Sequence, residues 1–399
     1  MLKKLLLLTP VFYFIVLPLV FCPIFYDRYE LPKVIAFISV TTVLTGCVFT
    51  ILSPKLNNVK FNILSVLLLV FSASLTTSSL LNFRQEVFLG QYYRYQGLVT
   101  LIAYLAFVWL FKQALDHVNL KLVGRIVAIG GTINALLILT QAIAFKILGL
   151  PIYQYNGRMT GLLGNPNFAG GFLVLSFVYS YFYLPTKPPW IRIIFYCLFF
   201  LAILATGSRS AILALLVTTI LVFWKNRKLV VALGVTTLVT GLLLVSYRPS
   251  LIESRPIIWQ KAIEAGVKKP IFGWGLENFD QAFQSVLKTN DFNLKDIRVD
   301  KAHNEFLEIL VAGGLVGLSL YLALIGTTFN RLWQKRKEKW ARVNLITLTA
   351  YLILGSLNVL NVTEYLFFYL ILAQVFKVVG RDQSKLALRI VVLKLLKTT

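Results

Sequence analysis

Long apolar stretches constrain this chain of 399 residues most strongly, because they leave no room for an ordinary water-soluble core. A helix that crosses a membrane needs about 20 mostly apolar residues, and it bonds its own backbone polar groups. Hydrophobic residues make up 58% of the chain and charged residues only 14%. The sequence therefore predicts an all-α polytopic membrane protein of about twelve transmembrane helices, at 5–25, 34–52, 63–81, 98–112, 122–146, 167–184, 190–206, 210–224, 229–247, 305–329, 343–359 and 364–379.

The distribution of basic residues predicts how these helices are oriented. A net charge of +24 would suggest nucleic-acid binding in a soluble protein. With the amino terminus in the cytoplasm, however, the predicted inner segments hold 24 of the 40 Lys and Arg residues, in keeping with the positive-inside rule. We therefore expect both termini in the cytoplasm, a lipid bilayer around the helices and no nucleic-acid partner. No small-residue cleavage site follows the first apolar stretch, so it is expected to be a retained anchor.

The predicted helices divide the chain into four parts. Helices one to nine occupy 1–247, an extracytoplasmic loop subdomain follows at 248–303, helices ten to twelve occupy 304–379, and a basic amphipathic tail at 380–399 is expected on the inner membrane surface. Within the loop, "RPIIWQKAIEAGVKKPIFGWG" predicts a helix with Pro256 in its first turn and Pro270 after its end. A second helix is predicted in "GWGLENFDQAFQSVL". The functional surface is therefore expected outside the cytoplasm.

His303 immediately precedes the tenth predicted helix, which places its imidazole at the boundary between water and lipid. A group with an ordinary pKa of about 6.5 can accept a proton near neutral pH, so this position suits a general base acting on a sugar hydroxyl. The alternative is a polar residue that packs on the loop. Asn304 and Glu305 either orient the ring or cap the helix. Three glycines are expected only to let this helix pack closely against a neighbour: Gly313, Gly314 and Gly317.

Two arginines lie at the same predicted membrane boundary. Arg209, in "ATGSRSAIL", interrupts an apolar hairpin, and Arg255, in "ESRPIIW", begins the first loop helix. A guanidinium there is costly unless it is paired, and its shape suits bidentate contact with phosphate. The pair therefore fits a lipid-linked diphosphate. The alternatives are snorkelling for Arg209 and an ordinary surface charge for Arg255.

Other polar residues on the predicted outer face are candidates for supporting or substrate-binding roles. The Gly-rich stretch "GRMTGLLGNPNFAGG" supplies Arg158, Asn165 and Asn167, although a simple turn explains the same composition. Arg94, in "QYYRYQG", suits a sugar platform, with interfacial anchoring by its tyrosines as the alternative. No metal site and no cofactor are expected from these residues.

Four motifs in this order resemble the bacterial O-antigen ligase and O-antigen polymerase superfamily: "GLLGNPNFAGGFL", "TGSRSAILAL", "SRPIIWQKAIEAGVKKPIFGWGLENF" and "KAHNEFLEILVAGGLVGLSLY". The resemblance implies a membrane glycosyltransferase (GT-C-like) of the bacterial inner membrane, with a periplasmic loop over its active site. It implies transfer of a glycan from undecaprenyl diphosphate to an acceptor hydroxyl, on the lipid A core or another surface acceptor, without a metal and with inversion. It also implies that His303 is the base or positions the acceptor, and that Arg209 and Arg255 hold the diphosphate.

This sequence departs from the family pattern at one place. Many members carry a second histidine one or two residues before the "HN" pair, where this chain has Lys301 and Ala302. Two other functions remain open at this point. A polymerase would extend lipid-linked glycan, and a small-anion transporter would place ionisable groups near the membrane midplane or use inverted repeats, neither of which this sequence shows.

Overall fold

The computed structural model describes residues 2–52, 62–150, 154–184, 188, 190–228, 230–232, 234–236, 239, 255–287 and 299–378. These residues form helices and connecting turns, with one isolated bridge between Tyr155 and Arg158. Seven helices in the described part are long and apolar enough to cross a membrane: Leu2–Leu19, which joins α1, η1 and η2, then α2 (Glu30–Leu52), α3 (Ile63–Leu81), α5 (Leu98–His117), α6 (Leu120–Lys146), α14 (Glu305–Gln334) and α15 (Lys339–Leu357). The all-helical, multi-pass fold is thereby confirmed.

The predicted count of twelve and the GT-C type stay predictions. The intervals at 190–206 and 210–224 hold the shorter apolar helices α8 (Trp190–Thr206) and α9 (Arg209–Phe223). A further helix occupies 362–378. The interval at 229–247 lies mostly outside the described residues, and the tail at 380–399 lies wholly outside them.

Helix α7 (Pro166–Tyr183) is the most enclosed element of the helical bundle. Its sequence is apolar around its whole circumference, as expected for a helix surrounded by others, and nearly all of its side chains are buried. It packs against α6, α8, α9 and α15. Its first turn therefore has a fixed place at one end of the bundle, beside the turn that joins α8 to α9.

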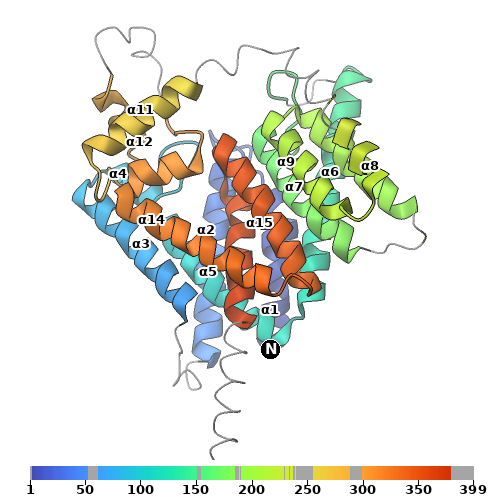
Figure 1. Cartoon of the computed structure of the whole chain (residues 1–399), viewed down its shortest axis with the longest axis horizontal. Coiled ribbons are helices and arrows are strands. Elements are labelled where there is room, and N and C mark those ends of the chain that lie inside the picture. Colours follow the sequence, from blue (N-terminus) through green and yellow to red (C-terminus); the bar gives the residue numbers. More distant parts are fainter. Residues whose placement is uncertain are drawn as a thin grey trace, which may run out of the picture.

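The loop helices cover that same end. Figure 1 shows α11 (Arg255–Lys268) and α12 (Phe279–Ser285) at the end of the molecule opposite the amino terminus. Both helices lie where the sequence predicted them, and Pro256 is the second residue of α11. They share a small core with the first turns of α14, built around Trp274, Phe283 and Val311. The loop helices are therefore attached directly to the residues that follow His303.

Helix α14 is broken at Gly314, where the backbone has φ 63° and ψ −162°. The carbonyl of Val311, freed by the break, accepts a hydrogen bond of 2.7 Å from the backbone N–H of Trp274. On the other side of the break, the N–H of Leu315 donates to the carbonyl of Pro270 at 2.7 Å. The loop backbone thus bonds the groups that the membrane cannot satisfy. The sequence reading of Gly314 as a packing glycine was wrong, although Gly313 does lie against a neighbouring helix.

Replacing Gly314 with alanine should destabilise the protein by at least about 2 kcal/mol, because only glycine adopts this conformation readily. A Cβ atom there would also lie 2.3 Å from the carbonyl oxygen of Ile271. Gly326→Ala, on the same helix, is the matched control, since nothing lies within 4 Å of its added carbon. Thermal unfolding in detergent measures both variants. Equal midpoints for the two would show that the break does not depend on Gly314.

Candidate functional site

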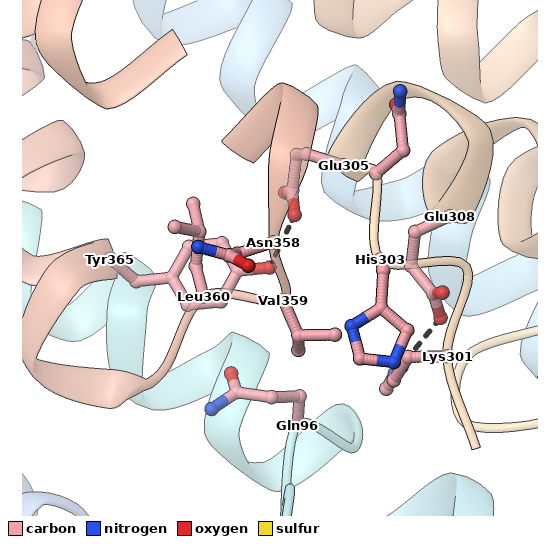
Figure 2. A pocket seen from close by; sticks show the side chains of 10 residues that line it. Gln96, Lys301, His303, Glu305, Glu308, Asn358, Val359, Leu360 and Tyr365 are labelled. Atoms are coloured by element: carbon pink, nitrogen blue, oxygen red, sulfur yellow. Dashed lines mark hydrogen bonds and ion pairs between the residues drawn. The ribbon is translucent and has the colours of Figure 1, made fainter. Parts of the chain in front are cut away.

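A small pocket opens where three segments meet. These are the start of α14, the connection between α15 and the helix at 362–378, and the residues before α5. Figure 2 shows the His303 ring among the side chains that line it. The lining residues are Gln96, Lys301, His303, Asn304, Glu305, Glu308, Asn358, Val359, Leu360 and Tyr365.

The backbone at His303 is held in an unusual conformation. His303 has φ 52°, a left-handed value that costs a residue with a side chain about 1–2 kcal/mol. The next residue, Asn304, caps α14, since its side-chain oxygen accepts hydrogen bonds from the N–H groups of Phe306 and Leu307 at 3.0 and 3.2 Å. Its amide nitrogen also donates to the carbonyl of Ser356 at 3.1 Å. The cap therefore fixes the backbone from which the histidine projects.

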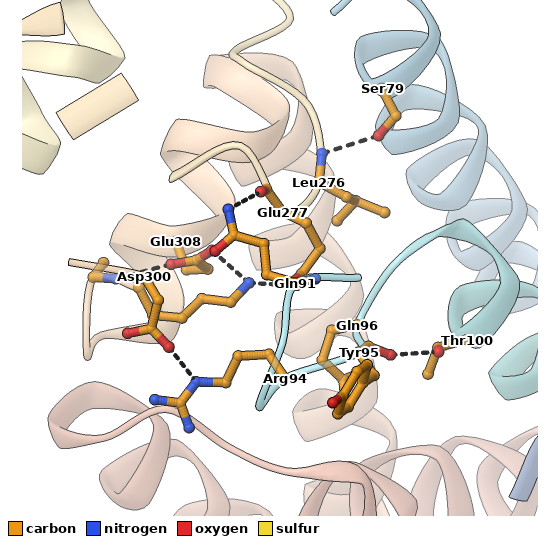
Figure 3. Close-up of polar contacts among 12 residues, drawn as sticks. Ser79, Gln91, Arg94, Tyr95, Gln96, Thr100, Leu276, Glu277, Asp300 and Glu308 are labelled. Atoms are coloured by element: carbon orange, nitrogen blue, oxygen red, sulfur yellow. Dashed lines mark hydrogen bonds and ion pairs between the residues drawn. The ribbon is translucent and has the colours of Figure 1, made fainter. Parts of the chain in front are cut away.

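The surroundings of His303 keep its ring neutral. Burial lowers the pKa of His303 to about 4, the positive charges of Arg94 and Arg255 act in the same direction, and Asp300 opposes them. The Arg94 Nε donates to the Asp300 carboxylate at 2.6 Å, a contact visible in Figure 3. A neutral imidazole has a free nitrogen lone pair that can accept a proton, so the ring is in the form that a base requires, and its lowered pKa makes it a weaker base than an ordinary histidine.

Removing the charge of Arg94 should raise the pKa of His303 from about 4 toward its ordinary value of 6.5. The Arg94→Gln variant deletes a repelling cation and leaves the Asp300 carboxylate unpaired, and both changes favour the protonated ring. NMR titration of labelled histidine measures this directly, because the chain has only two histidines. Arg84→Gln is the control, since Arg84 pairs with Asp280 instead. A His303 pKa that stayed unchanged in Arg94→Gln would contradict the electrostatic explanation.

Arg255 lies beside the pocket and is anchored to its wall. Its guanidinium donates to the carbonyl of Leu357 at 2.6 Å and to the side-chain oxygen of Asn358 at 3.2 Å. The Asn358 amide also donates to the hydroxyl of Ser210, next to Arg209. Burial lowers the pKa of Arg255, and the nearby charge of Arg209 lowers it further. Two guanidiniums that are far apart in the sequence therefore lie close enough to repel each other, and Arg255 also acts on His303.

These two arginines lack a neutralising partner within the described residues. No described carboxylate forms an ion pair with Arg209 or Arg255. One terminal nitrogen of Arg209 is buried without a hydrogen bond in the same part of the chain. A buried donor without an acceptor is costly. The arrangement is therefore suited to receive an anion with several acceptor oxygens.

Residues of the Gly-rich stretch that contains Arg158 hold the Arg209 turn in place. Arg158 donates to the carbonyl of Thr206 at 2.8 Å and to the side-chain oxygen of Asn167 at 2.9 Å. Asn165 caps α7 by accepting from the N–H of Asn167 at 2.8 Å. These contacts hold the α8–α9 turn, and with it Arg209, against the first turn of α7.

Arg94, which precedes α5 in the chain, also reaches the first turn of α7. Its guanidinium lies over the ring of Phe168, in the first turn of α7, at 5.9 Å. The structure therefore gathers the predicted arginines around the start of α7 and the pocket.

The sequence analysis did not predict a buried ionic cluster that lies beside the pocket (Figure 3). The Lys301 ammonium pairs with Glu277 at 2.6 Å and with Glu308 at 2.9 Å. The Glu277 carboxylate also accepts from the N–H of Gln91 at 2.7 Å. The only signal in the sequence was the departure from the family pattern at Lys301. This cluster joins the loop, the residues before α5 and the start of α14.

Two further pocket residues have roles that the sequence did not resolve. Glu305 is buried, and its carboxylate accepts a hydrogen bond from the Tyr365 hydroxyl at 2.7 Å. It therefore does not cap the helix, a role that belongs to Asn304. Asn358, between Arg255 and Ser210, was not singled out, because a lone asparagine after an apolar helix resembles an ordinary helix end.

Comparison with known proteins adds an independent line of evidence. Residues 193–322 match the family model described as O-antigen ligase, a region that contains Arg209, Arg255 and His303. The chain is also 31% identical over 146 residues to an O-antigen ligase of Pseudomonas aeruginosa strain PAO1, a match that covers 34% of this chain. It spans 33% of the length of that relative. These matches confirm the resemblance drawn from the four motifs, and they lie in the central region of the chain.

Proposed function

We propose that this protein is a glycosyltransferase that moves a glycan from an undecaprenyl-diphosphate carrier to an acceptor hydroxyl. The observation that carries the proposal is the closeness of Arg209 and Arg255, which have no carboxylate partner among the described residues, with Arg255 bonded to Asn358 in the wall of the His303 pocket. A diphosphate has the charge and the acceptor oxygens that two guanidiniums require. The acceptor hydroxyl belongs to the lipid A core or to another surface glycan or lipid.

The positions of these groups support a direct displacement at the anomeric carbon. The acceptor oxygen attacks the anomeric carbon while the bond from that carbon to the diphosphate oxygen breaks. Negative charge builds on the leaving diphosphate, where Arg209 and Arg255 stabilise it. His303 takes the proton of the acceptor hydroxyl. A single direct displacement inverts the anomeric centre, and the chain's own residues supply these roles without a metal or another cofactor.

The proposed site lies on the periplasmic face of the bacterial inner membrane. Support comes from the resemblance to O-antigen ligases, which implies a substrate joined to a membrane lipid. Further support comes from the loop helices α11 and α12, which lie at the end of the molecule opposite the amino terminus. In this orientation α11 and α12 cover the site from the aqueous side. The lipid carrier reaches Arg209 and Arg255 from the bilayer.

Product analysis with the purified protein and lipid-linked glycan tests the proposal. Glycan joined to a terminal acceptor supports the ligase. Lengthened lipid-linked chains would instead identify a polymerase, which uses the same donor site with another acceptor. Anion flux into sealed vesicles without any lipid-linked donor would overturn the proposal in favour of a transporter.

Arg255→Gln should lower kcat for transfer by about 10²–10³-fold, the usual cost of removing one group that stabilises developing negative charge. Lys268→Gln, at the exposed far end of the same helix α11, is the matched control and should leave kcat unchanged. Steady-state rates with a lipid-linked donor measure both variants. A loss of the same size in the two variants would indicate damage to α11 rather than loss of a diphosphate contact.

A further inference from the structure

A second concentration of charge lies at the other end of the helices, away from the pocket. We call it the distal cationic cluster, and it consists of Lys121, Arg125, Arg192, Lys339 and Arg342. The first two residues lie in the opening turns of α6, Arg192 lies in the first turn of α8, and the last two lie in the first turn of α15. Helix α15 ends at Leu357, next to the pocket. The cluster and the pocket are therefore separated by the length of that helix.

Aromatic residues at the end of α7 hold the distal cationic cluster together. The Lys339 ammonium lies 4.7 Å from the centre of the Tyr183 ring, and Arg342 lies 5.3 Å from that of Phe182. Arg192 lies 5.6 Å from the centre of the Tyr181 ring. Helices α8 and α15 thus bring their cations to one aromatic end.

The cations of this cluster repel one another, and no carboxylate of the described residues forms an ion pair with them. The charges of the other four members all act on Lys339. The positive ends of the α6, α8 and α15 dipoles add to the same potential. Nearby carboxylates in the described part of the chain are already engaged, since Glu338 pairs with Lys335 and Asp116 pairs with Lys377. The cluster therefore has a large, unbalanced positive potential.

One member of the cluster also has an unused donor. The Nε of Arg342 is buried and has no hydrogen-bond partner within the described residues. Helix α8 exposes Trp190, Ile193 and Ile194 on either side of Arg192. A cationic spot with a free donor next to an exposed apolar face fits a ligand that has an anionic head and an apolar tail.

We propose that the distal cationic cluster binds the phosphate headgroup of an anionic phospholipid of the surrounding membrane. The phosphate lies between the starts of α6, α8 and α15 and accepts a hydrogen bond from Arg342. Its acyl chains lie along the exposed apolar side chains of α8. Basic pockets between membrane helices bind such headgroups by the same combination of charge and apolar contact. The bound lipid joins the starts of three helices.

Native mass spectrometry of the purified full-length protein tests this site with phosphatidylglycerol as the probe. The wild type should retain phosphatidylglycerol in preference to phosphatidylcholine. Arg125→Gln combined with Arg192→Gln should weaken retention by about 25-fold, since one basic residue near an anionic lipid contributes about fivefold. Both residues are exposed, so the variant should fold. Arg331→Gln combined with Arg336→Gln removes two charges near the end of α14, outside the cluster, and should retain the lipid.

Inorganic phosphate separates a lipid from a free anion. In lipid-free detergent, thermal unfolding of the wild type should shift upward with phosphatidylglycerol and stay unchanged with inorganic phosphate. An equal shift with phosphate would overturn the assignment to a lipid. Equal retention of phosphatidylglycerol by the cluster variant and the wild type would overturn the site itself. Both readouts are independent of glycan transfer.

Discussion

Replacing His303 with alanine should slow glycan transfer by about 10²–10⁴-fold, the usual contribution of a positioned general base. This ring lies in the pocket near Arg255, one of the two arginines proposed to hold the donor, and its surroundings keep it neutral. The variant removes the proton acceptor and leaves the arginines in place. Donor binding should therefore change little while kcat falls, which steady-state kinetics with lipid-linked glycan separates.

The second histidine provides the matched control. His117 is exposed at the end of α5, so His117→Ala should transfer glycan at the wild-type rate. Adding imidazole to His303→Ala distinguishes a base from a residue that positions the acceptor. Recovery of rate, with an acid limb set by the added imidazole, identifies a base. A wild-type rate in His303→Ala would contradict both roles.

Replacing Lys301 with alanine should destabilise the protein by about 3–5 kcal/mol, because it strands buried carboxylates without their cation. The side chain of Glu277 is fully buried, and that of Lys301 is only 7% exposed. Burial alone would lower the pKa of Lys301, but Glu277 and Glu308 outweigh it and raise the pKa. The ammonium is therefore charged throughout the ordinary pH range, so its removal costs the whole of its interaction with the two carboxylates. Thermal unfolding in detergent measures the effect.

Two comparisons make this prediction specific. Lys335→Ala removes a cation from an exposed pair with Glu338 at 3.8 Å, and it should cost less than about 1 kcal/mol. Glu277→Gln and Glu308→Gln, added together to Lys301→Ala, remove the stranded charges and should restore part of the lost stability. A Lys301→Ala protein as stable as Lys335→Ala would show that the cluster is not a structural anchor.

The sequence predicted the helices well where each was long and apolar, and His303 was singled out because a histidine before an apolar helix is unusual. It could not show the break in α14. Glycines at a packing surface and a glycine in a broken helix look alike in sequence. What distinguishes Gly314 is that the backbone on both sides of it is hydrogen-bonded to the loop, and these loop residues lie about 40 residues earlier in the chain.

The sequence also could not predict the contacts within the site, because they join residues that are far apart in the chain. Arg209 and Arg255 were singled out because a guanidinium at a membrane boundary is costly. The contacts that hold them in place were not predicted. Arg255 is positioned by Asn358, 103 residues away, and Glu277 by Gln91, 186 residues away. A single sequence carries no sign of such pairs, since each member alone is an ordinary polar residue.

The break in α14 makes the loop part of the assembly of the membrane domain. A continuous helix satisfies its own backbone and can enter the bilayer alone. Helix α14 cannot, because residues on both sides of Gly314 need the backbone of 270–275. That segment precedes α14 in the chain, so it is already synthesised when α14 emerges. Helix α14 therefore reaches its final conformation only when the loop backbone lies beside it, and a change that displaces 270–275 should appear as a misfolded membrane helix.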